Sequence, residues 1–226
     1  MVQRGGDQVI PRPPGWRAGG PPPWHGVPAH ERRFSLDEVH AALRSHPVAR
    51  RDTTTAEANR AAAVLLALFE EAGEARLILT KRPEHLPTHQ GQIAFPGGKL
   101  DPGLDDDLAA AALREAHEEI GLDPAAVRVI AELDHIGTVV SAFSIAPFVG
   151  ALDERPSLVP APGEVTAVFD VALSELLAEE TWREEIWDLS WAPAAAMPFF
   201  ELPGETVWGA TARILANLLT FLTTPR

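Results

Sequence analysis

The sequence predicts an α/β fold in which helices cover the faces of a mixed sheet. Two observations lead to this prediction. Apolar runs typical of strands recur along the chain, and amphipathic patterns typical of helices lie among them. No internal repeat is visible.

The composition is that of a soluble globular protein, with 226 residues, 46% hydrophobic and 23% charged. The net charge of −13 argues against a general nucleic-acid binder and against attraction to anionic membranes. The chain has no cysteine, which excludes disulfides and thiolate chemistry and fits a reducing, cytoplasmic location. The longest apolar run, residues 61–69, is too short to span a bilayer, and the N-terminus lacks a signal-peptide pattern.

The first 33 residues are rich in proline and glycine and show no apolar periodicity. We therefore divide the chain into an extended or disordered arm, residues 1–33, and one folded domain, residues 34–226. Trp16 and Trp24 would lie across this domain or across a partner subunit in a homodimer. Because proline and glycine build no core, the arm is expected to be dispensable for folding.

The predicted elements follow one another in a mixed order. SLDE at 35–38 has the form of a capping box before a helix. Residues 61–69 and 75–82 favour a hairpin, although the alanines of the first run also permit a helix. QIAF at 92–95 and the runs at 127–133, 143–150 and 164–171 are typical of strands. Residues 105–121, 173–180 and 208–222 are typical of helices.

The helix at 105–121 gathers like charges, since Glu115, Glu118 and Glu119 fall within about one turn. At 100° per residue, the helical wheel places Ala109, Leu113, Ala116 and Ile120 on the face toward the sheet. The three glutamates fall opposite, together with Ala111 and Ala112, so that their carboxylates can converge without a protein cation at their centre. Such an oxygen-rich set suits Mg²⁺ or Mn²⁺, and the alternative is a solvated acidic face.

The segment FPGGKLDPG, residues 95–103, precedes this helix. Gly97 and Gly98 allow the backbone to approach a ligand closely and leave a carbonyl free to join a metal shell. A tight turn is the alternative for these glycines alone. The two features together, in this order, favour a metal-dependent site.

GGKLDPGLDDDLAAAALREAHEEIGL, residues 97–122, resembles the Nudix box: Gly, five residues, Glu, seven residues, then Arg-Glu-aliphatic-x-Glu-Glu-x-Gly-aliphatic. In the first half the chain departs from the box, because seven residues separate Gly98 from Asp106, which stands at the position of the first Glu. The resemblance implies an α/β/α sandwich and hydrolysis of a nucleoside diphosphate linked to another moiety. It implies Glu115, Glu118 and Glu119 as metal ligands with help from the backbone at Gly98, and Arg114 as the residue that orients them.

Three further segments are similar to the coenzyme A pyrophosphatase branch of that family: residues 77–98, SAFSIAPFVG (141–150) and VWGATARIL (207–215). The resemblance implies cleavage of coenzyme A to 4′-phosphopantetheine and adenosine 3′,5′-bisphosphate. Lys81, Arg82 and Lys99 are the candidate cations for substrate phosphate, above all the 3′-phosphate. Pro87 stands where that branch has an arginine, which favours ADP-ribose or a dinucleotide as the alternative substrate. A Nudix-fold protein that binds a nucleotide without cleaving it is a further alternative.

The general base is expected to be Glu118 or Glu164, the second of which lies in the loop segment PGEV. An exposed loop carboxylate is the alternative for Glu164. His85 and His89 are expected to be loop residues, and His117 is expected to be structural.

Overall fold

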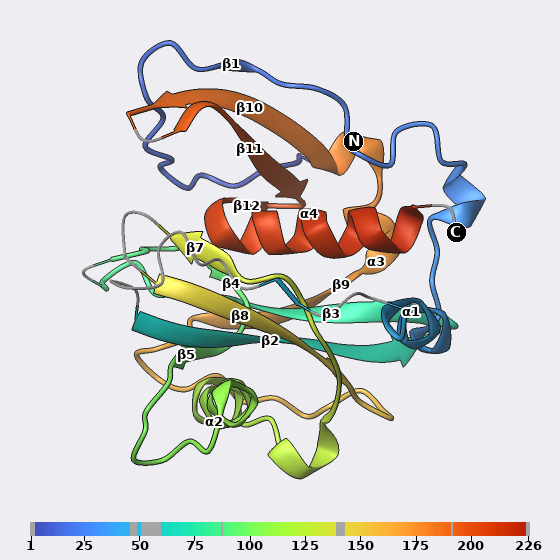
Figure 1. The fold of residues 1–226 in the computed structure, drawn as a ribbon, viewed down its shortest axis with the longest axis vertical. Helices are drawn as coiled ribbons and strands as arrows, with labels where there is room; N and C mark the ends of the chain where they lie inside the picture. The colour runs from blue at the N-terminus through green and yellow to red at the C-terminus, as the bar shows by residue number, and fades with distance from the viewer. Residues whose placement is uncertain are drawn as a thin grey trace.

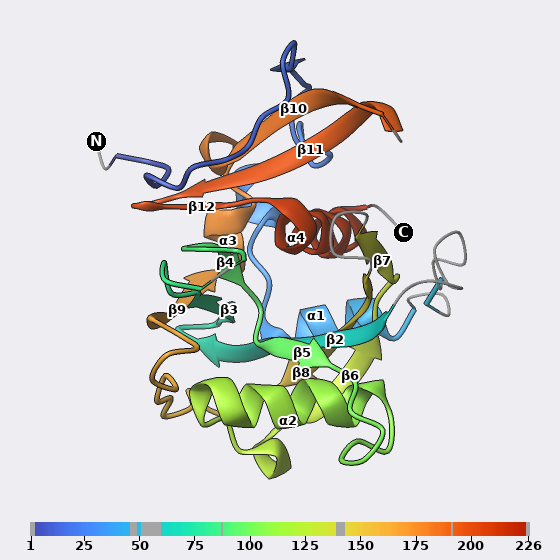
Figure 2. The same ribbon diagram turned by 90° about the vertical axis from the view of Figure 1, so that its left-hand side faces the viewer.

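The computed structural model describes residues 3–45, 49–50, 60–86, 88–138, 143–190 and 192–224. In this part of the chain the elements form stacked layers (Figure 1). Helix α2 (Leu108–Ile120) covers one face of a large mixed sheet, and helix α4 (Gly209–Thr223) covers the other. A smaller sheet lies beyond α4, so that α4 is enclosed between two sheets (Figures 1 and 2). The predicted α/β fold with a mixed sheet is confirmed.

The large sheet has the strand order β4-β3-β2-β8-β6, with three further strands paired to this path. Its strands are β2 (Arg60–Glu71), β3 (Glu74–Lys81), β4 (Ile93–Ala94), β5 (Gly97–Lys99), β6 (Arg128–Glu132), β7 (Ile136–Thr138), β8 (Phe143–Ala151) and β9 (Ala167–Ala172). β2 and β8 are parallel, and the other pairs are antiparallel. β2 therefore lies in the interior of the sheet, where its apolar sequence is buried on both faces.

The hairpin predicted for residues 61–82 is present as β2 and β3. Its turn is Ala72-Gly73, and both residues have positive φ, 52° and 73°. This is the backbone twist that suits a two-residue turn between antiparallel strands. The helical alternative for the first run is therefore wrong, because pairing with β3, β5 and β8 uses the backbone groups of β2.

Helix α1 (Leu36–Leu43) begins at the predicted capping box, whereas α2 begins three residues later than predicted. In the capping box, Ser35 and Glu38 bond each other's backbone N–H. Helix α2 is capped by Asp107, whose side chain accepts from the N–H of Ala110, and ends at Gly121 in the left-handed conformation. The predicted short helix is α3 (Leu173–Leu176), and the described residues also form 3₁₀ turns at Ala29–Glu31, Pro124–Ala126 and Glu179–Thr181. No helix in the described ranges is long and apolar enough to cross a membrane.

The smaller sheet was not predicted from the sequence. Its strands, in spatial order, are β1 (Arg17–Ala18), β10 (Trp182–Leu189), β11 (Ala192–Leu202) and β12 (Glu205–Val207). β10 carries several charges, and β11 is rich in alanine and proline, so neither shows strong strand alternation. Tertiary pairing decides their structure, because β10 and β11 pair over most of their length.

The arm packs against this smaller sheet, and Trp24 enters the core. The side chain of Trp24 is 1% exposed, stacks on Phe200 and meets Trp182 edge to face. Its indole N–H donates to the carbonyl of Leu177 at 2.8 Å. The arm therefore contributes to the core, contrary to the expectation drawn from its proline and glycine content.

Arginines fix the rest of the arm to the folded body. Arg4 donates to Glu175 at 2.6 Å and to Thr181 at 2.8 Å. Arg12 donates to both oxygens of Glu185, a carboxylate that is 1% exposed. A buried carboxylate needs such partners, so these contacts are part of the stability of the smaller sheet.

Trp24→Ala should lower the free energy of unfolding by about 3–5 kcal/mol, because it opens a cavity among aromatic rings and removes a buried hydrogen bond. Urea denaturation measures the change. Trp16→Ala is the matched control, because Trp16 is 46% exposed; its cost should stay below about 1 kcal/mol. Equal effects of the two substitutions would contradict the packing described above.

Candidate active site

The candidate site forms where α2 lies against the glycine strand β5. Gly97 and Gly98 pair with Val64 and Ala63 of β2. A Cβ on Gly97 would lie 2.3 Å from the carbonyl oxygen of Ala63, and one on Gly98 would lie 2.3–2.5 Å from the carboxyl atoms of Glu115. Only glycine allows this approach, so the FPGG segment brings a carboxylate of α2 onto the backbone of β5.

The predicted orientation of α2 is wrong for three residues. Ala111 and Ala112 are fully buried in the core toward the sheet, together with the correctly predicted Ala116 and Ile120. Glu119 also lies on the buried side and is 7% exposed. The helical-wheel prediction treated every glutamate as a surface residue, whereas the contact with β5 takes in a wider sector of the helix than its apolar stripe.

Glu119 is a buried carboxylate with few compensating contacts. Burial raises its pKa to about 7, against the lowering effects of the Gly97 N–H, which donates to Oε2 at 3.2 Å, and of the Arg82 charge. Glu115 and Glu164 contribute negative charge that raises the pKa further. The site thus concentrates negative charge in a poorly hydrated place, which is the environment that a cation would stabilise.

Arg114 holds the two other box glutamates. Its guanidinium donates to Glu118 at 2.8 Å and to Glu115 at 3.0 Å. It also donates to the backbone carbonyl of Lys99 at 3.2 Å, which ties the helix to β5. Burial still raises the pKa of Glu115, although Arg114 opposes this effect. Arg114 therefore bonds two of the three carboxylates, as expected of the residue that the resemblance implies for orienting them.

Asp105 is a site residue that the sequence analysis missed. It accepts from Arg114 Nε at 2.8 Å and Nη2 at 3.1 Å, and its carboxylate is 1% exposed. These bonds hold its pKa below its ordinary value. Asp106, which occupies the box position by spacing, is exposed. Six residues separate Asp105 from Gly98 and eight separate it from Arg114, one more on each side than in the box, so spacing alone chose the wrong aspartate.

The three candidate cations take different directions. Lys81 points to the α4 side of the sheet and pairs with Glu205 at 2.6 Å. Lys99 lies on β5 with its Nζ 5.5 Å from the centre of the Phe143 ring. Arg82 is the one whose charge acts on Glu119. The structure therefore brings Arg82 to the carboxylates and turns Lys81 away from them.

Glu164 lies in the loop that covers the C-terminal end of α2. The N–H of Ala161 donates to the Glu119 carbonyl at 2.8 Å, and the N–H of Val159 donates to that of Ile120 at 2.9 Å. Glu164 itself is exposed, and its charge is close enough to raise the pKa of Glu119.

His85 and His89 lie in a loop, as predicted. Both are exposed, and His89 bonds Gln92 at 2.9 Å. His117 bonds the carbonyl of Leu122 at 3.2 Å, beyond the end of the helix. The Pro87 mismatch lies outside the described residues.

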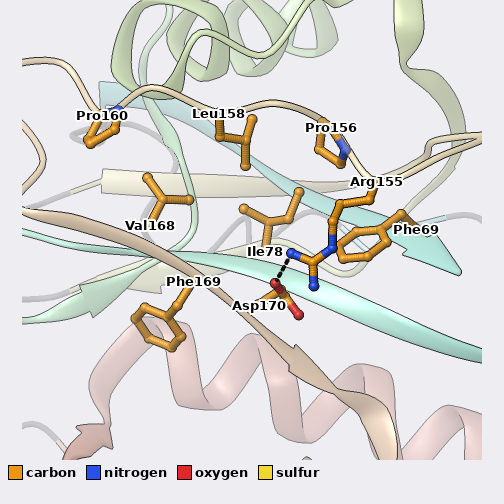
Figure 3. Close-up of a pocket in the computed structure, with 9 residues that line it drawn as sticks. All are labelled: Phe69, Ile78, Arg155, Pro156, Leu158, Pro160, Val168, Phe169 and Asp170. Carbon is orange, nitrogen blue, oxygen red and sulfur yellow. Dashed lines mark hydrogen bonds and ion pairs between the residues drawn. The ribbon is translucent and has the colours of Figure 1, made fainter. Parts of the chain in front are cut away.

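A cavity of about 260 Å³ lies under the same loop, on the side of β3 and β9 (Figure 3). Apolar side chains line most of it, and at one end Arg155 bonds Asp170 at 2.8 Å and lies 4.9 Å from the ring centre of Phe69. None of the predicted site residues lines this cavity. It therefore does not belong to the carboxylate cluster.

A NUDIX domain model matches residues 58–198, well over half of the chain. The chain belongs to the Nudix family. The chain is 40% identical over 165 residues to Nudix hydrolase 22, chloroplastic, of Arabidopsis thaliana, covering 70% of this chain and 54% of that protein. It is 38% identical over 171 residues to the uncharacterized Nudix hydrolase NudL of Enterobacter sp. (strain 638), covering 70% and 81%.

The chain thus spans about half the length of the plant Nudix relative. Among solved structures, it is similar to a MutT/nudix family protein from Enterococcus faecalis, with a TM-score of 0.50 and 14% identity. That match covers 84% of this chain and 70% of the other, and it supports the fold alone.

The residues present fit the divalent cation that the Nudix family implies. Burial raises the pKa of both Glu115 and Glu119, so a cation bound between them would stabilise their ionised forms. Gly98 keeps the space beside Glu115 free of any side chain. Among the described residues, however, no three acidic or histidine side chains are already gathered closely enough to hold a metal. Glu118 would have to turn from Arg114, which its half-exposed side chain allows.

Replacing Asp105 should uncouple Arg114 from the loop. Asp105→Ala leaves a half-buried guanidinium without its principal acceptor, so the free energy of unfolding should fall by roughly 2–4 kcal/mol. Asp106→Ala is the matched control and should change it by less than about 0.5 kcal/mol. Thermal and urea unfolding measure both. A larger cost at Asp106 would restore the register that spacing predicted.

The metal-free protein should become less stable as the pH rises from about 4.5 to about 7. Glu119 binds its proton more tightly in the folded state, since burial raises its pKa to about 7 from 4.5. The stability it contributes is present below its unfolded pKa and is lost as the pH rises through its folded value, by roughly 3 kcal/mol at most. Urea denaturation in chelator at several pH values measures this loss, and Glu119→Gln should remove it. An identical pH profile for the Gln variant would contradict the assignment.

Proposed function

We propose that this Nudix protein is a pyrophosphohydrolase that cleaves the diphosphate bridge of a nucleoside diphosphate derivative. The carrying observation is the contact of buried Glu119 and partly buried Glu115 with the glycine strand, beside Arg114. Cations would stabilise the ionised carboxylates of this cluster, and a divalent metal bound with a diphosphate supplies that positive charge. All three glutamates in the second half of the box are present, which argues against a protein that binds a nucleotide without cleaving it.

Glu115, Glu118 and Glu119, with the backbone at Gly98, are the groups that would hold Mg²⁺ or Mn²⁺. When bound, such a cation neutralises phosphate charge and lowers the pKa of a bound water. Arg114 orients Glu115 and Glu118 through its bonds to both, and Asp105 fixes Arg114 in turn. Glu115 is thereby positioned before substrate arrives, whereas Glu118 would leave its bond to Arg114 when a cation binds.

The hydrolysis breaks one bridging P–O bond while the oxygen of a water forms a new bond to that phosphorus. The water loses a proton to a carboxylate, and the leaving phosphate carries the bridging oxygen away. Glu118 and Glu164 are the two candidate bases. Glu118 is already bound by Arg114, whereas Glu164 is exposed on a loop whose backbone is bonded to Glu119. This difference favours Glu164 as the proton acceptor.

Coenzyme A is the first substrate we propose, giving 4′-phosphopantetheine and adenosine 3′,5′-bisphosphate. The support is the similarity of residues 77–98 to the coenzyme A branch. ADP-ribose or a dinucleotide is the second candidate, which the proline at position 87 favours. We likewise propose that the protein is cytoplasmic and forms a homodimer.

The full chain should release products from at least one of coenzyme A, ADP-ribose, NADH and diadenosine tetraphosphate when Mg²⁺ or Mn²⁺ is supplied. Chelation should abolish the activity, and Glu119→Gln should lower turnover at least about 100-fold, since it removes charge from the buried centre of the site. Circular dichroism should show an intact fold for the Gln variant. Chromatographic identification of the products decides among the substrates. No turnover of any substrate, or full activity in Glu119→Gln, would contradict the proposal.

A further inference from the structure

Arg82 directly follows β3, at the end of the strand that approaches the carboxylates. Side chains alternate along this strand: Leu77 and Leu79 enter the core beneath α4, and Ile78 enters the core beneath α2. Lys81 follows the first set and bonds Glu205. Arg82 continues the second set, and its backbone N–H donates to the carbonyl of Gln92 at 2.9 Å, which fixes the start of its side chain.

The guanidinium of Arg82 has a donor that no described group satisfies. Its Nε atom is buried from solvent and has no hydrogen-bond partner in the described part of the chain. A buried N–H on a charged group without an acceptor is costly, and such groups are uncommon in folded proteins. The neighbouring strand-end cation Lys81, by contrast, is fully engaged with a carboxylate.

The position of this donor relative to Glu119 indicates what would satisfy it. The Arg82 charge acts favourably on the Glu119 carboxylate, yet its Nε donates to no group in the described part of the chain. An anion placed between Arg82 and a cation at Glu119 would accept from the free Nε and complete the charge balance. Arginine presents several N–H groups in a rigid fork, which matches phosphate oxygens.

We infer that Arg82 binds the scissile diphosphate itself, next to Glu119, and not the more distant 3′-phosphate of coenzyme A. This inference rests on the proposed function and makes it more specific. The recognised substrate class is then any nucleoside diphosphate derivative that offers the diphosphate to Arg82 and the glutamates together. The 3′-phosphate contributes nothing through this residue, so dephospho-coenzyme A and ADP-ribose depend on Arg82 as strongly as coenzyme A does.

Steady-state kinetics of Arg82→Ala and Arg82→Lys test the inference with coenzyme A, dephospho-coenzyme A and ADP-ribose. For every substrate that the parent cleaves, Arg82→Ala should lower kcat/KM by the same factor, roughly 10- to 100-fold, as expected for one charge-assisted contact to phosphate. Arg82→Lys should recover part of the loss, because it restores the charge without the fork. Arg76→Ala is the matched control: it removes a cation from the same strand, bonded to Asp170 away from the site, and should leave kcat/KM unchanged.

A loss confined to coenzyme A, with dephospho-coenzyme A unaffected, would overturn the inference and return Arg82 to the 3′-phosphate. Kinetics of Arg82→Ala equal to those of the parent would overturn it as well.

Binding of α,β-methylene-ADP, a diphosphate that is not hydrolysed, provides a readout independent of turnover. Calorimetry with Mg²⁺ should show about 10-fold weaker binding by Arg82→Lys than by the parent, and unchanged binding by Arg76→Ala. This measurement decides the question even if Arg82→Ala does not fold. If the parent cleaves nothing yet binds the analogue through Arg82, the proposed function fails while the inference stands. Equal binding by the parent and Arg82→Lys would count against the inference.

Discussion

The close contact between α2 and the glycine strand β5 is the constraint on which the site depends. Two glycines remove the side chains that would otherwise separate helix from strand, and a carboxylate of α2 takes the space beside the second glycine. The same contact buries Glu119 and aligns Arg114 with the carbonyl of Lys99. A larger residue at either glycine would force the helix outward and separate these groups together, because protein interiors are closely packed.

This contact concentrates negative charge where water is scarce. Burial shifts Glu115 and Glu119 toward their neutral forms, whereas the bonds of Arg114 keep Asp105 ionised. Carboxylates in one cluster thus differ in their readiness to hold a cation or a proton. The difference in pKa comes from how deeply each carboxylate is buried and from which of them Arg114 bonds. It cannot be inferred from the residue types alone.

The sequence predicted the elements whose signals are local. The capping box at Ser35, the end of α2 at Gly121 and the hairpin about Ala72-Gly73 each depend on neighbouring residues, whereas the start of α2 was predicted three residues too early, at 105. The smaller sheet could not be predicted in this way, because β10 and β11 gain their structure from each other and from contacts with the arm and α4.

The box motif identified the glutamates and Arg114 but not their surroundings. Glu119 was placed opposite the sheet, because a helical wheel uses only the sequence of the helix and does not include the neighbouring strand β5. Asp105 was passed over, because it lies one residue before the position that the spacing of the box gives. The Arg82 donor has no sequence signature at all, since the absence of an acceptor is a property of three-dimensional packing.

The pairing of β1 with β10 has a consequence for biosynthesis. Arg17 lies opposite Ile186, and Trp24 fits between residues of β10 and β11. These contacts join the beginning of the chain to a region that leaves the ribosome more than 150 residues later. At typical rates of about 5–20 residues per second, the arm waits for many seconds without its partner strand. The smaller sheet can therefore close only after β10 and β11 have been synthesised.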